Sequence, residues 1–279
     1  MATLIRRIYN SYRHLNENLS DPRTQDYFLI GSPWGYFSII IFYLYFVHEL
    51  GPSIMAKRKP FNLDKVVQIY NLVQIVLCAF LFYKAMTLAW LNDYSIYCQP
   101  VDFSYDPRAL EISRMVWLYF VIKLLDLLDT VFFVLRKKQK QISFLHVYHH
   151  TGMTFGTWVC TKFLPGGHIT FLGTVNCFVH VIMYTYYLVT SLQKETNKLW
   201  WKKYVTQLQL TQFFVILVHF VLLAWGEDCG FPKWTAAVMI PQNLFMIVLF
   251  ADFYYKTYIK KYKKSSTNGI TPNEKLKSQ

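Results

Sequence analysis

Charge is the first thing that this sequence has little of. Only 16% of its 279 residues are Asp, Glu, Lys or Arg, whereas an average soluble domain has about 25%. Hydrophobic residues make up 54% of the chain, and they come in long blocks separated by short charged loops. This distribution argues against an ordinary soluble domain and is typical of a polytopic membrane protein.

The N-terminal tail lacks the features of a secretory signal peptide. Residues 1–32 are polar and contain arginines, so no apolar run follows the start of the chain. We therefore expect the first membrane span to act as its own insertion signal. Asn18-Leu19-Ser20 in this tail is a glycosylation sequon, which can be used only if the tail is lumenal.

Seven hydrophobic blocks follow the tail, and most exceed about 18 residues, which is enough to cross the hydrocarbon layer as a helix. They lie at 33–50, 66–90, 114–135, 143–163, 168–190, 205–225 and 235–258. The fourth and fifth are separated only by Leu164-Pro165-Gly166-Gly167, which predicts a tight turn between two helices. The predicted fold class is all-α. We expect a single seven-helix membrane domain at 33–259, between the tail at 1–32 and a basic tail at 260–279.

Basic residues indicate the orientation in the membrane. If every block spans, four basic segments share one side, and the positive-inside rule places that side in the cytosol. Their residues are Lys57, Arg58, Lys59 and Lys65; Arg136, Lys137, Lys138 and Lys140; Lys194, Lys198, Lys202 and Lys203; and Lys260, Lys261, Lys263 and Lys264. The C-terminus is then cytosolic and the N-terminus lumenal. The four arginines of the tail, Arg6, Arg7, Arg13 and Arg23, argue weakly for the opposite orientation.

Cysteine is also scarce, with five residues in the chain. Three of them fall within predicted spans. Only Cys98 and Cys229 fall in loops, and both loops are lumenal in this topology. An oxidising lumen would permit a disulfide between them, although two unrelated free thiols are an equally good interpretation. At the other end, Lys275 and Lys277 resemble a dilysine retrieval signal of the endoplasmic reticulum.

Histidine is rare, but three of the eight histidines stand together in His146-Val147-Tyr148-His149-His150. On a helix, the three imidazoles would share one face. Burying them at the edge of an apolar segment is costly unless they have partners. The pattern indicates metal ligation, proton transfer or nucleophilic attack. His180, in the next span, is the fourth candidate of this cluster, whereas we expect His168 to lie near water.

Other polar residues inside the spans have two interpretations each. One helix face carries Lys123, Asp126 and Asp129. These side chains form either a buried salt bridge or part of a functional site. Asn176, His180 and Tyr184 stand one turn apart, which favours a site over packing. Thr206, Gln209 and Gln212 form a polar stripe for interhelical hydrogen bonds or for substrate contact.

Three classes of protein compete at this point. A membrane di-iron desaturase also has an HxxHH box, but it needs about eight histidine ligands, and this chain has one box, one extra histidine and no HxxxH pair. A transporter often shows inverted repeats, which are not evident here, and a receptor leaves the clustered histidines without a role. Acyl transfer suits them better, because a neutral imidazole can attack a thioester or accept a proton from an acidic carbon.

Four motifs, in order along the chain, resemble those of the animal very-long-chain fatty acid elongases, the membrane 3-ketoacyl-CoA synthases. They are Lys123-Leu124-Leu125-Asp126-Leu127-Leu128-Asp129-Thr130, the histidine box, Asn176 to His180 running into Met183-Tyr184-Thr185-Tyr186-Tyr187, and Thr206-Gln207-Leu208-Gln209-Leu210-Thr211-Gln212. The family motif usually has Glu at the position of Asp126. The box is similar to the branch that handles long and very long acyl chains.

The resemblance implies a fold and a mechanism. Six helices would form a barrel around a closed acyl tunnel that opens to the cytosol, with one further helix outside. Malonyl-CoA and an acyl-CoA would condense through an acyl-imidazole on His149, with His180 positioning the second substrate or handling a proton. His146 and His150 would orient or polarise groups within the box. Asn176 and Tyr184 would donate hydrogen bonds to a thioester or enolate oxygen.

The same resemblance also implies which residues bind CoA and which molecules the protein interacts with. Lys137, Lys138, Lys202 and Lys203 are candidates for holding the CoA phosphates, although they serve equally well as determinants of topology. No cofactor or resident metal is expected, because condensation involves no redox step. The expected partners are the lipid bilayer, the two CoA substrates, the reductases and dehydratase that complete an elongation cycle, and a second copy of the chain. Nucleic acid is a poor match to this charge distribution.

Overall fold

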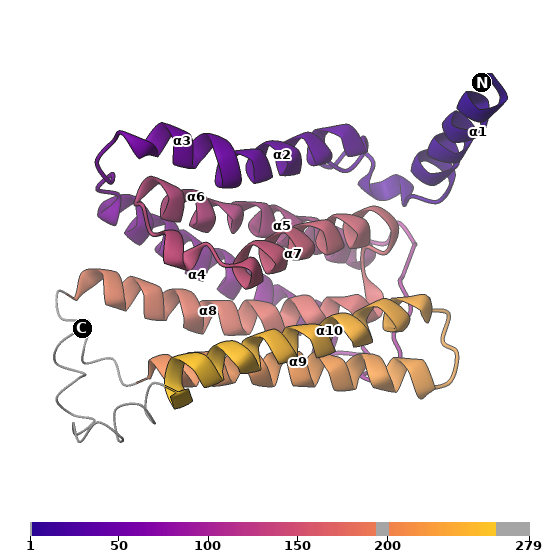
Figure 1. Ribbon diagram of the computed structural model, residues 1–279. Coiled ribbons are helices and arrows are strands. Elements are labelled where there is room, and N and C mark those ends of the chain that lie inside the picture. Colours follow the sequence, from indigo (N-terminus) through magenta and orange to yellow (C-terminus); the bar gives the residue numbers. More distant parts are fainter. Residues whose placement is uncertain (1, 194–200, 261–279) are drawn as a thin grey trace. The chain divides into compact units, whose positions relative to one another are not determined.

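The computed structural model describes residues 2–193 and 201–260, and every regular element within those ranges is helical (Figure 1). Several basic residues considered above lie outside the described residues. They are Lys194, Lys198, Lys261, Lys263, Lys264, Lys275 and Lys277. The chain forms two compact units. The first comprises Met1–Leu63, Tyr83–Ser95 and Gln99–Gly173, and the second comprises Asp64–Phe82, Ile96–Cys98 and Thr174–Gln279.

Membrane-spanning helices account for much of the structure. Five helical stretches among the described residues are long and apolar enough to cross a bilayer, so the chain is a multi-pass membrane protein. They are Pro33–Ala56, Asp64–Trp90, Gly167–Leu192, Lys202–Trp225 and Trp234–Ile259. The predicted spans at 114–135 and 143–163 are also helical, but the first is interrupted and both carry buried charged or polar side chains. Their crossing, and hence a total of seven, stays a prediction.

The first unit contains α1 (Ala2–Arg13), α2 (Pro33–Tyr45), α3 (Gly51–Ala56), α5 (Pro107–Leu125), α6 (Leu127–Leu135) and α7 (Phe144–Phe163). Pro33 and Pro107 begin α2 and α5, where a missing backbone N–H costs nothing because the first turn has no intrahelical acceptor for it. Tyr36, Phe120 and Trp158 bring α2, α5 and α7 into one core. The rings of Tyr36 and Trp158 stack with their centroids 5.3 Å apart.

The predicted span at 114–135 is interrupted at Asp126, between α5 and α6. The backbone N–H of Asp126 still bonds to the Ile122 carbonyl at 2.9 Å, and the N–H of Asp129 bonds to the Asp126 carbonyl at 3.3 Å. The backbone therefore forms one 3₁₀-type hydrogen bond at this point and remains helical. The interruption coincides with the buried carboxylate of Asp126.

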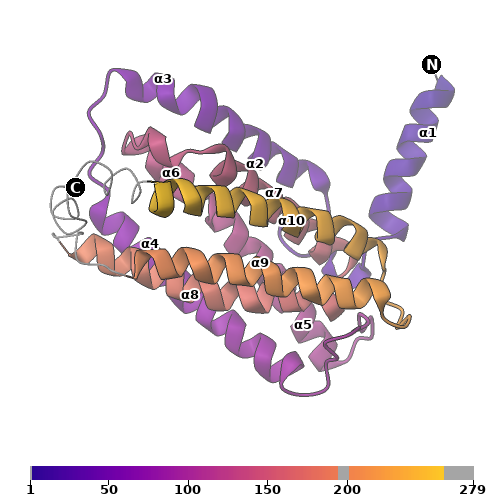
Figure 2. The same ribbon diagram turned by 60° about the horizontal axis from the view of Figure 1, so that its bottom comes forward.

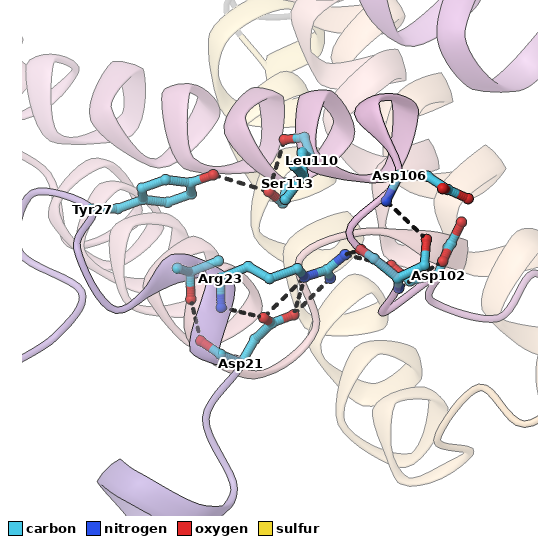
Figure 3. Close-up of polar contacts among 9 residues, drawn as sticks. Asp21, Arg23, Tyr27, Asp102, Asp106, Leu110 and Ser113 are labelled. Carbon is cyan, nitrogen blue, oxygen red and sulfur yellow. Dashed lines mark hydrogen bonds and ion pairs between the residues drawn. The ribbon is translucent and has the colours of Figure 1, made fainter.

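Within the first unit, the part of the N-terminal tail around the short 3₁₀ turn Pro22–Thr24 contacts the loop before α5 (Figure 3). Arg23 and Asp21 form an ion pair of 2.7 Å in which both side chains are almost wholly buried. The Arg23 guanidinium also donates to the carbonyls of Asp102 and Ser104 at 2.8 and 2.7 Å. Hydrogen bonds from the backbone and the hydroxyl of Ser104 lower the pKa of the Asp102 carboxyl. Residues 21–23 are therefore part of the folded structure of this unit.

Lys162, near the end of α7, is tied to the same tail. Its side chain is buried, and its ammonium group donates to the carbonyls of Ile30 and Gly31 at 2.7 and 3.1 Å. The indole of Trp158 donates to the Leu29 carbonyl at 2.9 Å. A buried ammonium must have such acceptors, so the tail supplies hydrogen-bond partners that α7 alone lacks.

The turn after α7 corrects one expectation. We expected His168 near water, but its side chain is fully buried, and its backbone N–H donates to the Gln99 carbonyl at 2.8 Å. The preceding Gly167 has φ +64°, and a Cβ there would lie 2.8 Å from the Gln99 carbonyl oxygen. The predicted turn at 164–167 therefore also anchors a distant loop.

The second unit contains most of α4 (Asp64–Ala85) and of α8 (Thr170–Leu192), together with α9 (Lys202–Trp225) and α10 (Trp234–Tyr254). The last two helices lie side by side in both views (Figures 1 and 2), with the rings of Phe213 and Phe250 5.0 Å apart. Cys98 and Cys229 form a disulfide in this unit, with a Cα–Cα distance of 6.0 Å. The bond joins the loop before α5 to the loop between α9 and α10.

Candidate functional site

The histidine box forms the first turns of α7. The hydroxyl of Ser143 caps this helix by accepting a hydrogen bond from the His146 backbone N–H at 3.3 Å. Because residues three and four apart on a helix are neighbours, the three imidazoles come together as predicted. The ring centroids of His146 and His150 are 4.3 Å apart, and those of His149 and His150 are 5.4 Å apart at 90°.

A hydroxyl pair from two other helices holds His146. Its Nε2 lies 3.0 Å from the hydroxyl of Thr130 on α6, and the same hydroxyl accepts a hydrogen bond of 2.8 Å from Tyr43 on α2. Tyr43 and Thr130 are both buried. Sequence reasoning missed these two residues as partners of the box, although Thr130 ends the first motif. Such contacts fix the orientation of an imidazole and determine which of its nitrogens carries the proton.

Lys123 and Asp126 form a buried ion pair of 2.9 Å, with side chains 3% and 2% exposed. The ammonium group also lies 5.0 Å from the centre of the Tyr119 ring. The structure thus shows the salt bridge that was one of the two interpretations of this motif. Asp129, also part of the predicted face, lies partly exposed on α6, and its backbone contacts Asp126.

A second polar group, which we call the His180 group, is built on α8 and consists of Asn176, His180 and Tyr184. All three side chains are buried, at 2%, 5% and 0% exposed. The rings of His180 and Tyr184 meet edge to face with centroids 5.5 Å apart. The predicted alignment of these residues on one helix face is therefore what the structure shows.

The stripe on α9 divides between two neighbours. Gln212 accepts a hydrogen bond from Asn176 Nδ2 at 3.5 Å, and the Gln209 amide contacts the Met183 sulfur at 3.4 Å, so both reach α8. Thr206 instead lies 3.4 Å from the hydroxyl of Tyr258, beyond α10. Interhelical hydrogen bonding, one of the two interpretations of this stripe, accounts for all three contacts.

Sequence reasoning missed the contribution of α4 to this unit. The hydroxyl of Tyr70 lies 3.3 Å from that of Tyr184, and Gln74 donates to Tyr70 at 3.0 Å. Asn71 and Gln74 are buried, at 2% and 0% exposed. Polar amides in an apolar span were a signal that could have identified them, because such groups are costly to place in a membrane.

The four lysines proposed for CoA are exposed. Lys137 has φ +54° and its ammonium group lies 3.4 Å from the Ala56 carbonyl, while Lys203 lies 4.9 Å from the Tyr204 ring centre. Lys138, in the loop after α6, and Lys202, the first residue of α9, are exposed. These positions suit contact with a phosphate as well as solvation.

Each unit places polar side chains within apolar helices: three imidazoles in the first unit, and an imidazole, an amide and a phenol in the second. Imidazoles that are kept from water can act as nucleophiles or bases, and buried amides and phenols can stabilise a developing oxyanion. The histidine box lies in the first unit and the His180 group in the second.

Comparisons with known proteins bear on this chemistry. The model of the family described as ELO, GNS1/SUR4, matches residues 28–266. Very long chain fatty acid elongase 7 of Drosophila melanogaster is 42% identical over 254 residues, which cover 91% of this chain and 77% of that protein. Very long chain fatty acid elongase 4 of Mus musculus is 43% identical over 266 residues, covering 94% and 85%. Elongase 1 of the same species is 39% identical, covering 91% of each.

Proposed function

Because the chain belongs to the ELO (GNS1/SUR4) family, we propose that it is a very-long-chain fatty acid elongase, specifically the 3-ketoacyl-CoA synthase that condenses an acyl-CoA with malonyl-CoA. The observation that carries this proposal is the similarity to named elongases across 90% or more of the chain. The grouping of three imidazoles on α7 supports it, because acyl transfer needs a nucleophile away from bulk water.

The first half of the reaction uses the histidine box. A nitrogen of the neutral His149 imidazole attacks the thioester carbonyl of the acyl-CoA, the carbon–sulfur bond breaks, and the CoA thiolate leaves. The product is an acyl-imidazole that keeps the proton on its other ring nitrogen, so its positive charge balances that of the thiolate. His146, held by Thr130, and His150, in ring contact with both neighbours, orient His149 for this attack.

The second half uses the His180 group. Malonyl-CoA loses carbon dioxide, and the electron pair of the broken carbon–carbon bond becomes an enolate. The enolate carbon attacks the acyl carbonyl and the bond to His149 breaks, which releases a 3-ketoacyl-CoA two carbons longer. Asn176 and Tyr184 donate hydrogen bonds to the thioester oxygen on which the enolate charge develops, and His180 positions malonyl-CoA or transfers a proton.

We also propose where the substrates bind and in which membrane the protein lies. The acyl chain occupies apolar surface between the spans, and exposed lysines hold the CoA phosphates at the cytosolic side. The bond between Cys98 and Cys229 supports a lumenal location for their loops, because disulfides persist in oxidising compartments. We accordingly propose the endoplasmic reticulum membrane, with a lumenal N-terminus and a cytosolic C-terminus. The reaction needs no redox cofactor, and partner enzymes of the same membrane reduce and dehydrate its product.

The test is incorporation of radiolabelled malonyl-CoA by membranes that contain this chain, with acyl-CoAs of different lengths. We expect lipid two carbons longer than the substrate, and a loss of at least about 1,000-fold in rate for His149→Ala, because the nucleophile is gone. His14→Ala removes an exposed histidine of the tail and serves as the control. No incorporation with any acyl-CoA by folded protein, or full activity of His149→Ala, would refute the mechanism.

A further inference from the structure

Helix α4 contacts the His180 group through a chain of polar side chains. The Gln74 amide donates to the Tyr70 hydroxyl at 3.0 Å, and the Tyr70 hydroxyl lies 3.3 Å from that of Tyr184. The rings of Tyr70 and Tyr184 also meet edge to face, with centroids 5.9 Å apart. Tyr184 in turn packs against the His180 ring. Tyr70 thus contacts the phenol that lies beside the histidine.

Asn71 lies next to Tyr70 and one turn before Gln74. The side chains of Asn71, Gln74 and Cys78 are all buried, so they define the inward face of α4. The Asn71 Nδ2 is shielded from solvent, and no group in the described part of the chain accepts a hydrogen bond from it. A buried donor that lacks a partner is destabilising, so this amide suits an acceptor brought by a ligand.

We propose that α4 forms part of the substrate site of the elongase, with Tyr70 as a positioning residue and Asn71 as a substrate-binding residue. Tyr70, held by Gln74, fixes the hydroxyl of Tyr184 and, through the ring contact, the orientation of His180. Asn71 Nδ2 donates a hydrogen bond to an oxygen of the malonyl thioester or carboxylate. This inference rests on the proposed function, because it assigns α4 to the second half of the condensation.

Two substitutions separate this role from a structural one. Tyr70→Phe keeps the ring contact but removes the hydroxyl, and Asn71→Leu removes the amide while keeping a similar volume. Because Asn71 Nδ2 forms no hydrogen bond among the described residues, Asn71→Leu should leave the thermal unfolding midpoint unchanged or raised. Tyr83→Phe, on an exposed side chain of the same helix, is the matched control.

The expected result is a loss confined to the second half-reaction. The rate of condensation should fall about tenfold or more in Tyr70→Phe and about 100-fold in Asn71→Leu, as when an oriented donor to a developing oxyanion is removed. The Asn71→Leu variant should also show a raised KM for malonyl-CoA. Release of CoA from acyl-CoA alone, which reports acylation of His149, should match that of the wild type and of Tyr83→Phe.

Three other outcomes are distinguishable. Wild-type activity in both variants would overturn this inference while the elongase proposal stands. A lowered unfolding midpoint with equal loss of both half-reactions would assign α4 a structural role and likewise overturn it. Absence of CoA release and of condensation in the wild-type protein would refute the proposed function itself, which is a different result from either of the others.

Discussion

At the scale of single residues, Arg23 shows that the partners of a charged side chain decide whether it is evidence for membrane orientation. In the sequence, Arg23 is one of the positive residues that argue against a lumenal location of the tail. In the structure its side chain is buried, paired with Asp21, and bonded to two backbone carbonyls of another loop. A neutralised, buried guanidinium is part of the fold. The four basic segments therefore remain the stronger indicators of orientation.

Lys123 and Asp126 make a prediction at the same scale. Removing one member of a buried ion pair leaves an uncompensated charge and destabilises a protein by about 3–5 kcal/mol. We therefore expect Lys123→Met to lower the unfolding midpoint strongly. The double variant Lys123→Met with Asp126→Leu should recover most of the loss, because both charges are gone. Thermal unfolding of the purified protein in detergent measures both.

The control for that pair is Lys256→Met. Lys256 forms an ion pair of 2.7 Å with Asp252, but both side chains are more than half exposed, and exposed pairs contribute only about 0–1 kcal/mol. If Lys123→Met lowered the unfolding midpoint no more than Lys256→Met, the buried pair would contribute no more to stability than an exposed one.

At the scale of elements, the helices followed from local pattern, but their interruptions and connections did not. The block at 114–135 was expected as one continuous span, and it divides at Asp126, whose buried carboxylate pairs with Lys123. The turn at 164–167 was expected from its Pro and Gly residues. Its contact with the loop at 99–100 was not, because it joins residues far apart in sequence.

Two glycines test this connection. Gly167 has a positive φ, and a Cβ there would meet the Gln99 and Pro100 backbone at 2.8–2.9 Å. We expect Gly167→Ala to destabilise the first unit by about 1–3 kcal/mol, since both the backbone conformation and the close approach are strained. The measurement is the shift in thermal unfolding midpoint.

Gly156, in α7, is the matched control. A Cβ at Gly156 meets nothing within 4 Å, and alanine has the higher helix propensity by about 1 kcal/mol. Gly156→Ala should therefore be neutral or stabilising. Equal effects of the two substitutions on the unfolding midpoint would show that the close approach to the loop at 99–100 does not affect stability.

At the scale of the whole molecule, the disulfide is the longest covalent constraint in the described chain. It joins residues 131 positions apart. Closing a loop of this length restricts the unfolded chain, which typically stabilises a protein by about 2–4 kcal/mol. We expect Cys229→Ser to lower the unfolding midpoint of the second unit accordingly, and to abolish the difference in gel mobility between reduced and unreduced protein.

The double variant Cys98→Ser with Cys229→Ser completes this test. It should be no less stable than either single variant, because one bond is lost in every case. A further loss of stability in the double variant would show that the two cysteine side chains contribute to stability apart from the disulfide.

The sequence by itself determined what depends on neighbours along the chain. Apolar blocks predicted the helices, and spacing predicted that His146 and His150, and likewise His180 and Tyr184, would meet, because helix geometry alone brings such residues together. The identity of these candidate residues was therefore readable before the fold was known.

Only the tertiary structure decided which distant groups meet. Tyr70 and Tyr184 are 114 residues apart, and Tyr70 stood among the many aromatic residues of the chain with no local mark to distinguish it. Likewise, His168 was expected near water, but its side chain is buried and its backbone N–H donates to the Gln99 carbonyl, from elsewhere in the chain. Local periodicity predicts which face of a helix is buried. The helix that packs against that face depends on contacts between distant parts of the chain, and no short stretch of sequence encodes these contacts.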